Sequence, residues 1–283
     1  MNIGIFAKTF ERSTLEDNLR AVKEHGIRAV QYNMSCAGLP PMSERIDHET
    51  VKRIRTAADS EGITIAAVSG TCNMAHPDAG VRQVGIDRLR GLASICSLLG
   101  TSIITLCTGT RDVNNMWRKH PDNHLPEAWR DLVVSMEQAL DIADEYDVTL
   151  AFEPEPSNVV DSAGKGCQLI REMQSPRLKV VFDAANLLSN VSLSDGVTRQ
   201  QEDVLNEAFD LLGEQIALAH AKDVTAGSTK EFVSAGQGTL SYALYVKLLR
   251  QVDFRGYLIL HGLKECEVDD SVAFLREKLS AKA

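Results

Sequence analysis

The sequence has 283 residues, of which 44% are hydrophobic, so it can bury a large core as two ordinary domains or one large α/β barrel. Asp and Glu (39) outnumber Lys and Arg (30), and no basic stripe could neutralise a phosphate backbone. This balance argues against nucleic acid and anionic membranes as partners. With no apolar run near the ~20 residues that span a bilayer and no recognisable leader, we expect a cytoplasmic protein with reduced cysteines.

Short β-rich runs alternate with helical periodicity along the whole chain. The eight predicted strands cover residues 2–6, 29–33, 63–68, 102–107, 148–152, 179–183, 216–220 and 257–261. Between them, apolar residues recur every three or four positions, most clearly over residues 14–26, 48–62 and 125–146, which predicts amphipathic helices. Gly26, Gly62 and Gly100 stand where helix C-caps are expected.

Eight strands alternating with helices within ~250 residues predict a parallel sheet closed into a (β/α)8 barrel. A doubly wound open sheet would need a Gly-rich turn after the first strand, where the sequence reads FAKTFERS. No Pro/Gly/Ser-rich linker divides the chain, so residues 1–283 are predicted to form one domain. The longest irregular stretches, 108–125 and 221–239, follow strands and are expected at the carboxyl end of the barrel, where active sites lie.

The fifth to eighth predicted strands end in residues that can bind a metal. Residues two apart share one face of a strand, so Glu153 lies opposite the bulky Phe152 and faces the barrel mouth. The same alternation places Asp183, His220 and His261 inside. Converging carboxylates repel unless a cation lies between them. Together with two imidazoles they suit one divalent ion, for which Mn²⁺ is expected, with Co²⁺, Fe²⁺, Zn²⁺ or Mg²⁺ as alternatives.

Nearly the whole chain resembles the sugar phosphate isomerase/epimerase, or xylose isomerase-like, TIM barrels. The resemblance is carried by LAFEPEP (150–156), VVFDAANLL (180–188), LAHAKD (218–223), AGQG (235–238) and YLILHGL (257–263). That family holds one divalent metal with a Glu, an Asp, a His and a second Glu after strands five to eight, which implies Glu153, Asp183 and His220 as ligands here. His261 replaces the second Glu, and Asn186 stands where many relatives carry a substrate-binding His.

These departures direct attention to neighbouring groups. In the epimerases of this family the two glutamates shuttle a proton, so Glu155 is a candidate base or substrate contact, unless it is a loop carboxylate that accepts backbone amides. His261 would bind the metal or exchange protons, because a metal-bound nitrogen cannot do both. Lys222 would stabilise charge on a substrate carbonyl, the alternative being a surface pair with Asp223.

Substrate contacts are expected from the polar residues around the mouth. The candidates are Thr108, Thr110, Arg111, Trp117, Asn186 and Asp223. Hydroxyls and a guanidinium suit a carboxylate, phosphate or polyol, and an indole suits the face of a sugar ring. The alternative is that the threonines cap a turn, Arg111 pairs with Asp112 and Trp117 anchors its loop.

The function expected first is a metal-dependent isomerase or epimerase that converts a small sugar, keto-sugar or sugar acid through an enediolate. The same enediolate would serve a lyase, either a dehydratase or a decarboxylase. An endonuclease IV-like nuclease would need more than the seven histidines present and a basic groove. A non-catalytic sugar-binding barrel is the remaining alternative. The oligomeric state is left open, with a homodimer or homotetramer as the expectation.

Overall fold

Eight parallel strands close into a barrel in the computed structural model, which describes residues 1–189, 199–227 and 229–281. The barrel strands are β1 (Asn2–Phe6), β2 (Ala29–Tyr32), β3 (Thr64–Ser69), β4 (Ile103–Cys107), β5 (Thr149–Glu153), β6 (Leu178–Asp183), β7 (Ile216–Ala221) and β10 (Tyr257–Leu260). Their order around the ring is β1-β10-β7-β6-β5-β4-β3-β2, so the first and last strands pair. The predicted (β/α)8 TIM barrel is confirmed.

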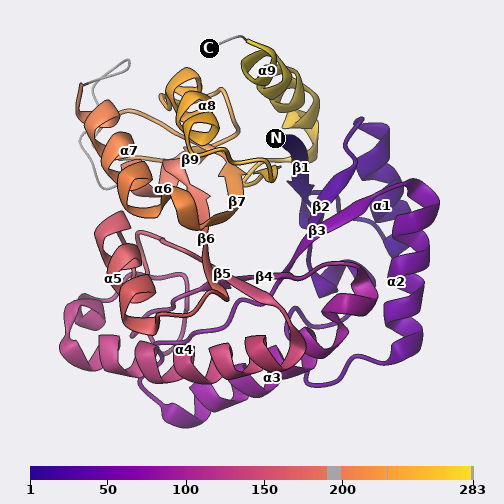
Figure 1. Cartoon of the computed structure of the whole chain (residues 1–283). Helices are drawn as coiled ribbons and strands as arrows, with labels where there is room; N and C mark the ends of the chain where they lie inside the picture. Colours follow the sequence, from indigo (N-terminus) through magenta and orange to yellow (C-terminus); the bar gives the residue numbers. More distant parts are fainter. Residues whose placement is uncertain (190–198, 228, 282–283) are drawn as a thin grey trace.

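Helices surround the ring of strands (Figure 1). They are α1 (Leu15–Glu24), α2 (His48–Glu61), α3 (Ala79–Leu99), α4 (Pro126–Tyr146), α5 (Ala163–Met173), α6 (Ala184–Ser189), α7 (Arg199–Leu212), α8 (Tyr242–Gln251) and α9 (Val268–Ser280). Gly62 and Gly100 are left-handed C-caps as predicted, and Gly26, also left-handed, follows the C-cap His25. No helix in the described ranges is long and apolar enough to cross a membrane.

The barrel strands separate two hydrophobic layers. Ala151, Val181, Leu218 and Ile259 belong to a small cluster inside the barrel, where space is narrow. Bulkier neighbours such as Phe152 pack in the main core between strands and helices. The alternation predicted from the sequence is therefore confirmed, and it fixes which strand-end side chains point into the mouth.

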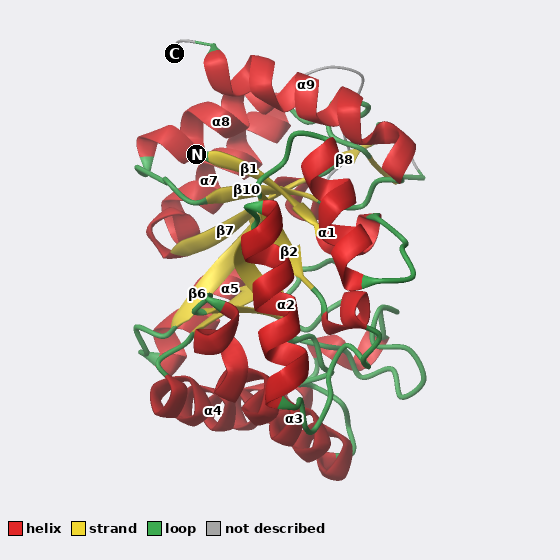
Figure 2. Ribbon diagram, turned by 90° about the vertical axis from the view of Figure 1, so that its right-hand side faces the viewer, coloured by secondary structure: helices red, strands yellow, loops and turns green. Residues whose placement is uncertain are grey.

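Two of the connections that leave the barrel strands are long. The connection after β4 contains a 3-10 helix at Pro121–His124 and leads into α4. The connection after β7 contains a short antiparallel pair, β8 (Asp223–Val224) and β9 (Phe232–Val233); residue 228 lies outside the described residues. As predicted, both stretches follow a strand. The longer loops extend from one end of the barrel, at the right of Figure 2.

Candidate metal centre and active site

Three metal-competent side chains converge at the carboxyl ends of neighbouring strands. Glu153 ends β5, Asp183 ends β6 and His220 lies one residue before the end of β7. One ligand atom from each lies within 4.8 Å of the others. His220 Nδ1 is 3.3 Å from Glu153 Oε1 and 3.6 Å from Asp183 Oδ2. Because Asp183 and His220 are register partners, the sheet itself sets this convergence.

Asn186 and Lys222 connect the two carboxylates. Asn186 Nδ2 donates to Glu153 Oε1 at 2.7 Å, and Lys222 Nζ donates to Asn186 Oδ1 at 2.8 Å. Lys222 Nζ also lies 3.2 Å from Asp183 Oδ2. The backbone N–H of Asn186 donates to Asp183 Oδ1 at 3.0 Å in the first turn of α6. The start of α6 thus positions an amide that joins an ammonium to the cluster.

The charges of the cluster shift one another's pKa values. Burial by itself lowers the pKa of His220, but Glu153 and Asp183 outweigh burial and raise that pKa to about 9. Burial would raise the pKa of the Asp183 carboxyl, but Lys222 and His220 hold it well below its usual range. Burial would lower the pKa of Lys222, which the carboxylates raise overall. A proton on His220 and the ammonium therefore balance the carboxylates of the metal-free protein.

His261 lies beside this group of three but is not a member of it. Its ring stacks on His220 (centroids 4.8 Å apart) and on Phe6 (5.4 Å). Burial, followed by the positive charges of His220 and Lys222, holds the pKa of His261 well below its usual value, so the ring is neutral. Its Nδ1 is buried and has no hydrogen-bond partner within the described residues.

The donor set fits a divalent transition ion. Two carboxylates and an imidazole suit Mn²⁺, Fe²⁺, Co²⁺ or Zn²⁺, whereas Ca²⁺ prefers oxygen ligands throughout. Asp183 Oδ2 is a buried oxygen that accepts no hydrogen bond of regular geometry in the part of the chain described, although Lys222 Nζ (3.2 Å) and His220 Nδ1 (3.6 Å) lie near it as charge partners. Such buried polar atoms are normally satisfied, so a bound ion is a natural partner for this oxygen.

Gln31, which the sequence analysis did not single out, completes the surroundings of His220. Its Oε1 lies 2.8 Å from His220 Nε2, and its Nε2 donates to Ser69 Oγ (3.2 Å) and Thr105 Oγ1 (3.1 Å). These contacts orient the amide so that its oxygen accepts the Nε2 proton and leaves Nδ1 facing the carboxylates. The only sequence signal is a polar residue in the middle of the apolar run AVQYN.

A cavity of about 800 Å³ opens above the cluster, a volume that suits a small-molecule ligand. Of the predicted site residues it is lined by Glu153, Glu155, Trp117, Asn186, His220, Lys222 and His261. Burial and the nearby Glu153 raise the pKa of Glu155 to about 8, against the lowering effect of Lys222. No described group donates a hydrogen bond to the Glu155 carboxylate, so the alternative of a carboxylate bound by backbone amides is not what the structure shows.

Thr108, Thr110 and Arg111 do not line the cavity, so their expected contact with substrate stays a prediction that the structure does not support. Both threonines are fully buried and bond within the loops, Thr108 to Asn158 and Thr110 to Asn123. These hydrogen bonds engage both hydroxyls, because the loops after β4 and β5 pack against each other.

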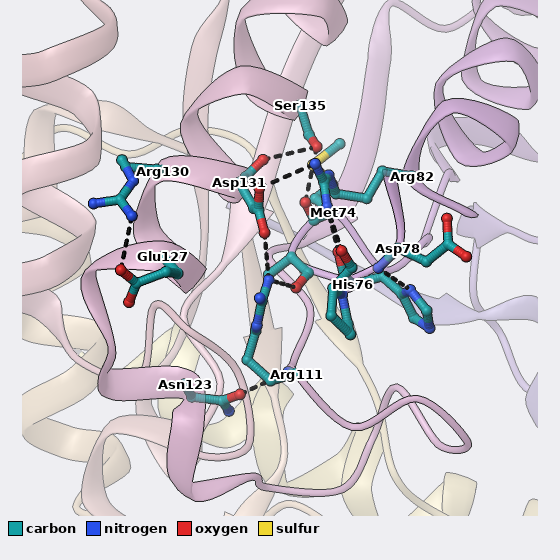
Figure 3. A network of polar contacts seen from close by, with 12 residues as sticks. Met74, His76, Asp78, Arg82, Arg111, Asn123, Glu127, Arg130, Asp131 and Ser135 are labelled. Atoms are coloured by element: carbon teal, nitrogen blue, oxygen red, sulfur yellow. Dashed lines mark hydrogen bonds and ion pairs between the residues drawn. The ribbon is translucent and has the colours of Figure 1, made fainter. Parts of the chain in front are cut away.

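Arg111 is instead part of a polar network that joins the loops after β3 and β4 to α3 and α4 (Figure 3). Its guanidinium pairs with Asp131 of α4 and donates to the carbonyl of Ala75. Arg82 of α3 pairs with the same carboxylate, so the network attaches the loop after β3 to α4. The predicted alternative partner, Asp112, is bound by Arg118.

Asp223 likewise bonds within its own loop and does not line the cavity, so its expected role in substrate binding stays a prediction. It is buried, and its carboxylate accepts backbone N–H groups from Val224, Gly236 and Leu240. A Cβ at Gly238 would meet Asp223 Oδ1 at 2.3 Å, so the AGQG turn needs its glycine for close packing. Lys222 and Asp223 therefore do not form the surface pair considered from the sequence.

Comparisons with known proteins agree with this fold. A family model described as the xylose isomerase-like TIM barrel matches residues 19–278. The structure of a D-tagatose 3-epimerase-like protein is 15% identical (TM-score 0.76; 99% of this chain and 97% of that chain covered). A probable 3-DHS dehydratase involved in petrobactin synthesis from Bacillus anthracis is 15% identical (0.74; 98% and 99%). The IOLI protein, whose structure contains a bound zinc atom, is 16% identical (0.74; 99% and 98%). No curated protein matches the sequence.

Proposed function

Because the chain belongs to the xylose isomerase-like TIM barrel family, we propose that it is a metal-dependent enzyme that isomerises or epimerises a small sugar, keto-sugar or sugar acid. The observation that carries this proposal is the convergence of Glu153, Asp183 and His220 beneath a cavity of about 800 Å³. Glu155 and Lys222 line the same cavity, which brings a carboxylate and an ammonium within reach of one bound molecule.

Each of these residues has a role in the proposed reaction. Glu153, Asp183 and His220 would hold one divalent ion, Mn²⁺ in our proposal, which when bound supplies a Lewis acid beside the substrate carbonyl. Glu155 would take the proton from the carbon next to that carbonyl. Lys222 would donate a hydrogen bond to the oxygen on which negative charge develops.

His261 and Trp117 complete the proposed site. His261 offers a neutral ring whose buried Nδ1 has no hydrogen-bond partner among the described residues, and this nitrogen would bind the metal or accept a hydrogen bond from the substrate. The half-exposed indole of Trp117 lines the cavity and offers an apolar face to a sugar ring.

A lyase is the second candidate. Removal of the same proton precedes loss of water in a dehydratase, and the structurally similar protein from Bacillus anthracis is named as a probable dehydratase. His261 also stands where the family resemblance places the second proton-shuttling Glu, which favours a reaction that does not return a proton to the opposite face.

The two candidates are separated by NMR in D₂O with a panel of ketoses, inososes and 3-oxo sugar acids and Mn²⁺-loaded protein. Deuterium at the carbon beside the carbonyl without loss of mass identifies an isomerase or epimerase, and loss of water or CO₂ identifies a lyase. Glu155→Gln should abolish the exchange while leaving Mn²⁺ bound. If the protein binds no divalent ion, and Glu153→Gln and His220→Ala leave thermal stability with and without Mn²⁺ unchanged, a non-catalytic barrel is the correct reading.

A further inference from the structure

Arg88 is a cation in the cavity wall whose partner is missing from the described residues. It lies on α3 and lines the cavity. Its Nε is buried and has no hydrogen-bond partner, and no carboxylate in the described ranges pairs with its guanidinium. Other arginines of the same helix are paired, Arg82 with Asp131 and Arg90 with Glu145. The missing partner is therefore a property of this position and not of the helix.

A buried donor that bonds to nothing is costly, so its retention requires a compensating contact. The planar fork of a guanidinium matches the two oxygens of a carboxylate or a phosphate. Replacing such a group with an apolar one of similar shape should cost no stability if the protein itself supplies no partner. Arg88 thus has the features of an anion-binding side chain.

The charges around the cavity agree with an anionic ligand. Lys8, which follows β1, also lines the cavity and has no ion pair within the part of the chain described. On the far side of the mouth, the carboxylates of Glu153 and Asp183 already have positive partners. Glu153 pairs with His220, and Asp183 pairs with Lys222. If a divalent ion balances those two carboxylates, Glu155 is the one remaining carboxylate among the described residues of the cavity lining. The three cations Lys8, Arg88 and Lys222 then outnumber it, and the cavity carries excess positive charge.

The positions in the ring set the geometry of binding. The strand that precedes α3 is β3, which stands four places from β7 in the eight-membered order and so lies across the mouth from His220. A molecule whose carbonyl end reaches the cluster of Glu153, Asp183 and His220 would extend its other end toward Arg88.

We propose that Arg88 binds an anionic terminal group of the substrate, a carboxylate or a phosphate, so that the enzyme acts on a sugar acid or sugar phosphate and not on a neutral sugar. This proposal rests on the proposed function and names its substrate class. Lys8 lies at the same mouth as a second, exposed cation that attracts the anion.

The test compares three probes with one carbon skeleton, D-glucitol, D-gluconate and D-glucitol 6-phosphate, by calorimetry on Mn²⁺-loaded protein. We expect one anion to bind about ten- to a hundredfold more tightly than D-glucitol, the value of a charge-assisted contact. Which anion is preferred distinguishes a carboxylate from a phosphate. Arg88→Met should remove the preference, and Arg90→Met on the outer face of the same helix should keep it.

Two further readings separate the outcomes. Mn²⁺ affinity, measured by electron paramagnetic resonance, should be the same in both variants. If the unaltered protein binds no Mn²⁺, this result contradicts the proposed function and not the anion site. The thermal midpoint of Arg88→Met without ligand should be equal to or above that of the unaltered protein. Equal binding of the three probes, no detectable binding of either anion, or a preference that survives Arg88→Met would each overturn the proposal.

Discussion

The two sides of the barrel mouth use polar side chains in different ways. On the side of β5, β6 and β7, charged groups contact one another directly, as His220 does with Glu153 and Asp183. On the side of β2, β3 and β4, the polar groups inside the barrel are neutral, and Gln31 bonds to two hydroxyls and to His220. The first side has the groups for chemistry, and the second holds those groups in place. Polar residues at a barrel mouth therefore differ in role according to the partners that they contact.

Removing one ligand should have the largest effect on the charged side. Asp183→Asn should weaken Mn²⁺ binding by more than about 100-fold, because losing even a residue that only orients a ligand costs about 10–100-fold. Calorimetric titration with Mn²⁺ measures the change. Glu155→Gln is the matched control, since it makes the same carboxylate-to-amide change in the same cavity, and it should alter the affinity much less. Equal losses in the two variants would contradict the assignment of Asp183 as a ligand.

The pH dependence of metal binding sharpens the same assignment. The metal-free protein holds a proton on His220 below a pKa of about 9, and that proton must leave before Nδ1 can bind an ion. Mn²⁺ affinity should therefore rise by about tenfold per pH unit through the neutral range and level off near pH 9.

The same shift has a second consequence for the metal-free protein. Because the folded pKa of His220 lies above its ordinary value of 6.5, its proton contributes stability that is complete below pH 6.5 and lost as the pH rises through about 9. Thermal unfolding with a chelator present should show this fall. An Mn²⁺ affinity that does not change with pH would show that His220 does not ligate the ion.

Gln31 tests the supporting role of the opposite side. Gln31→Leu removes the acceptor for His220 Nε2 and should weaken Mn²⁺ binding by about 10–100-fold. Gln31→Glu retains an acceptor and should preserve most of the affinity. Nitrogen-15 NMR of the metal-loaded imidazole gives an independent reading, because the proton should stay on Nε2 in the unaltered protein. If Leu and Glu variants bind Mn²⁺ equally, the contact does not orient His220.

The smallest effect is expected where a polar network fastens loops to helices and does not line the cavity. Arg111→Met breaks the pair with Asp131, and we expect the free energy of unfolding to fall by about 1 to 2 kcal/mol. Mn²⁺ affinity should stay unchanged, as measured by the titration described for Asp183. This result would be the opposite of that expected for Arg88→Met, in which stability holds and anion preference is lost. A change in metal affinity would place Arg111 nearer the site than the structure does.

The sequence predicted those parts of the site that follow from strand periodicity. Glu153, Asp183 and His220 come together because side chains alternate along a strand and parallel strands end at the same edge of the barrel. The left-handed positions at Gly62 and Gly100 were also predictable, because a helix that leads into a strand commonly ends at glycine.

The other parts depend on partners that only the folded chain brings together. Thr108 and Arg111 looked like substrate contacts. In the folded chain Thr108 bonds to Asn158 and Arg111 pairs with Asp131, and both partners lie far along the sequence. Nothing in the sequence marked Arg88 as a residue of the cavity, because an arginine within an amphipathic helix is expected on the exposed face. Gln31 could be seen as a polar residue in a strand, but its contact with His220 spans the barrel interior.

The stack of Phe6, His261 and His220 has a consequence for how the protein is made. Phe6 ends β1, His220 lies in β7 and His261 directly follows β10; these strands are neighbours in the barrel, and β1 meets β10 at the seam where the chain closes. During synthesis β1 leaves the ribosome long before β10 exists. The seam and the ring stack can therefore form only after nearly all of the 283 residues have been translated, so a nascent chain carries its carboxylate ligands well before the site is complete.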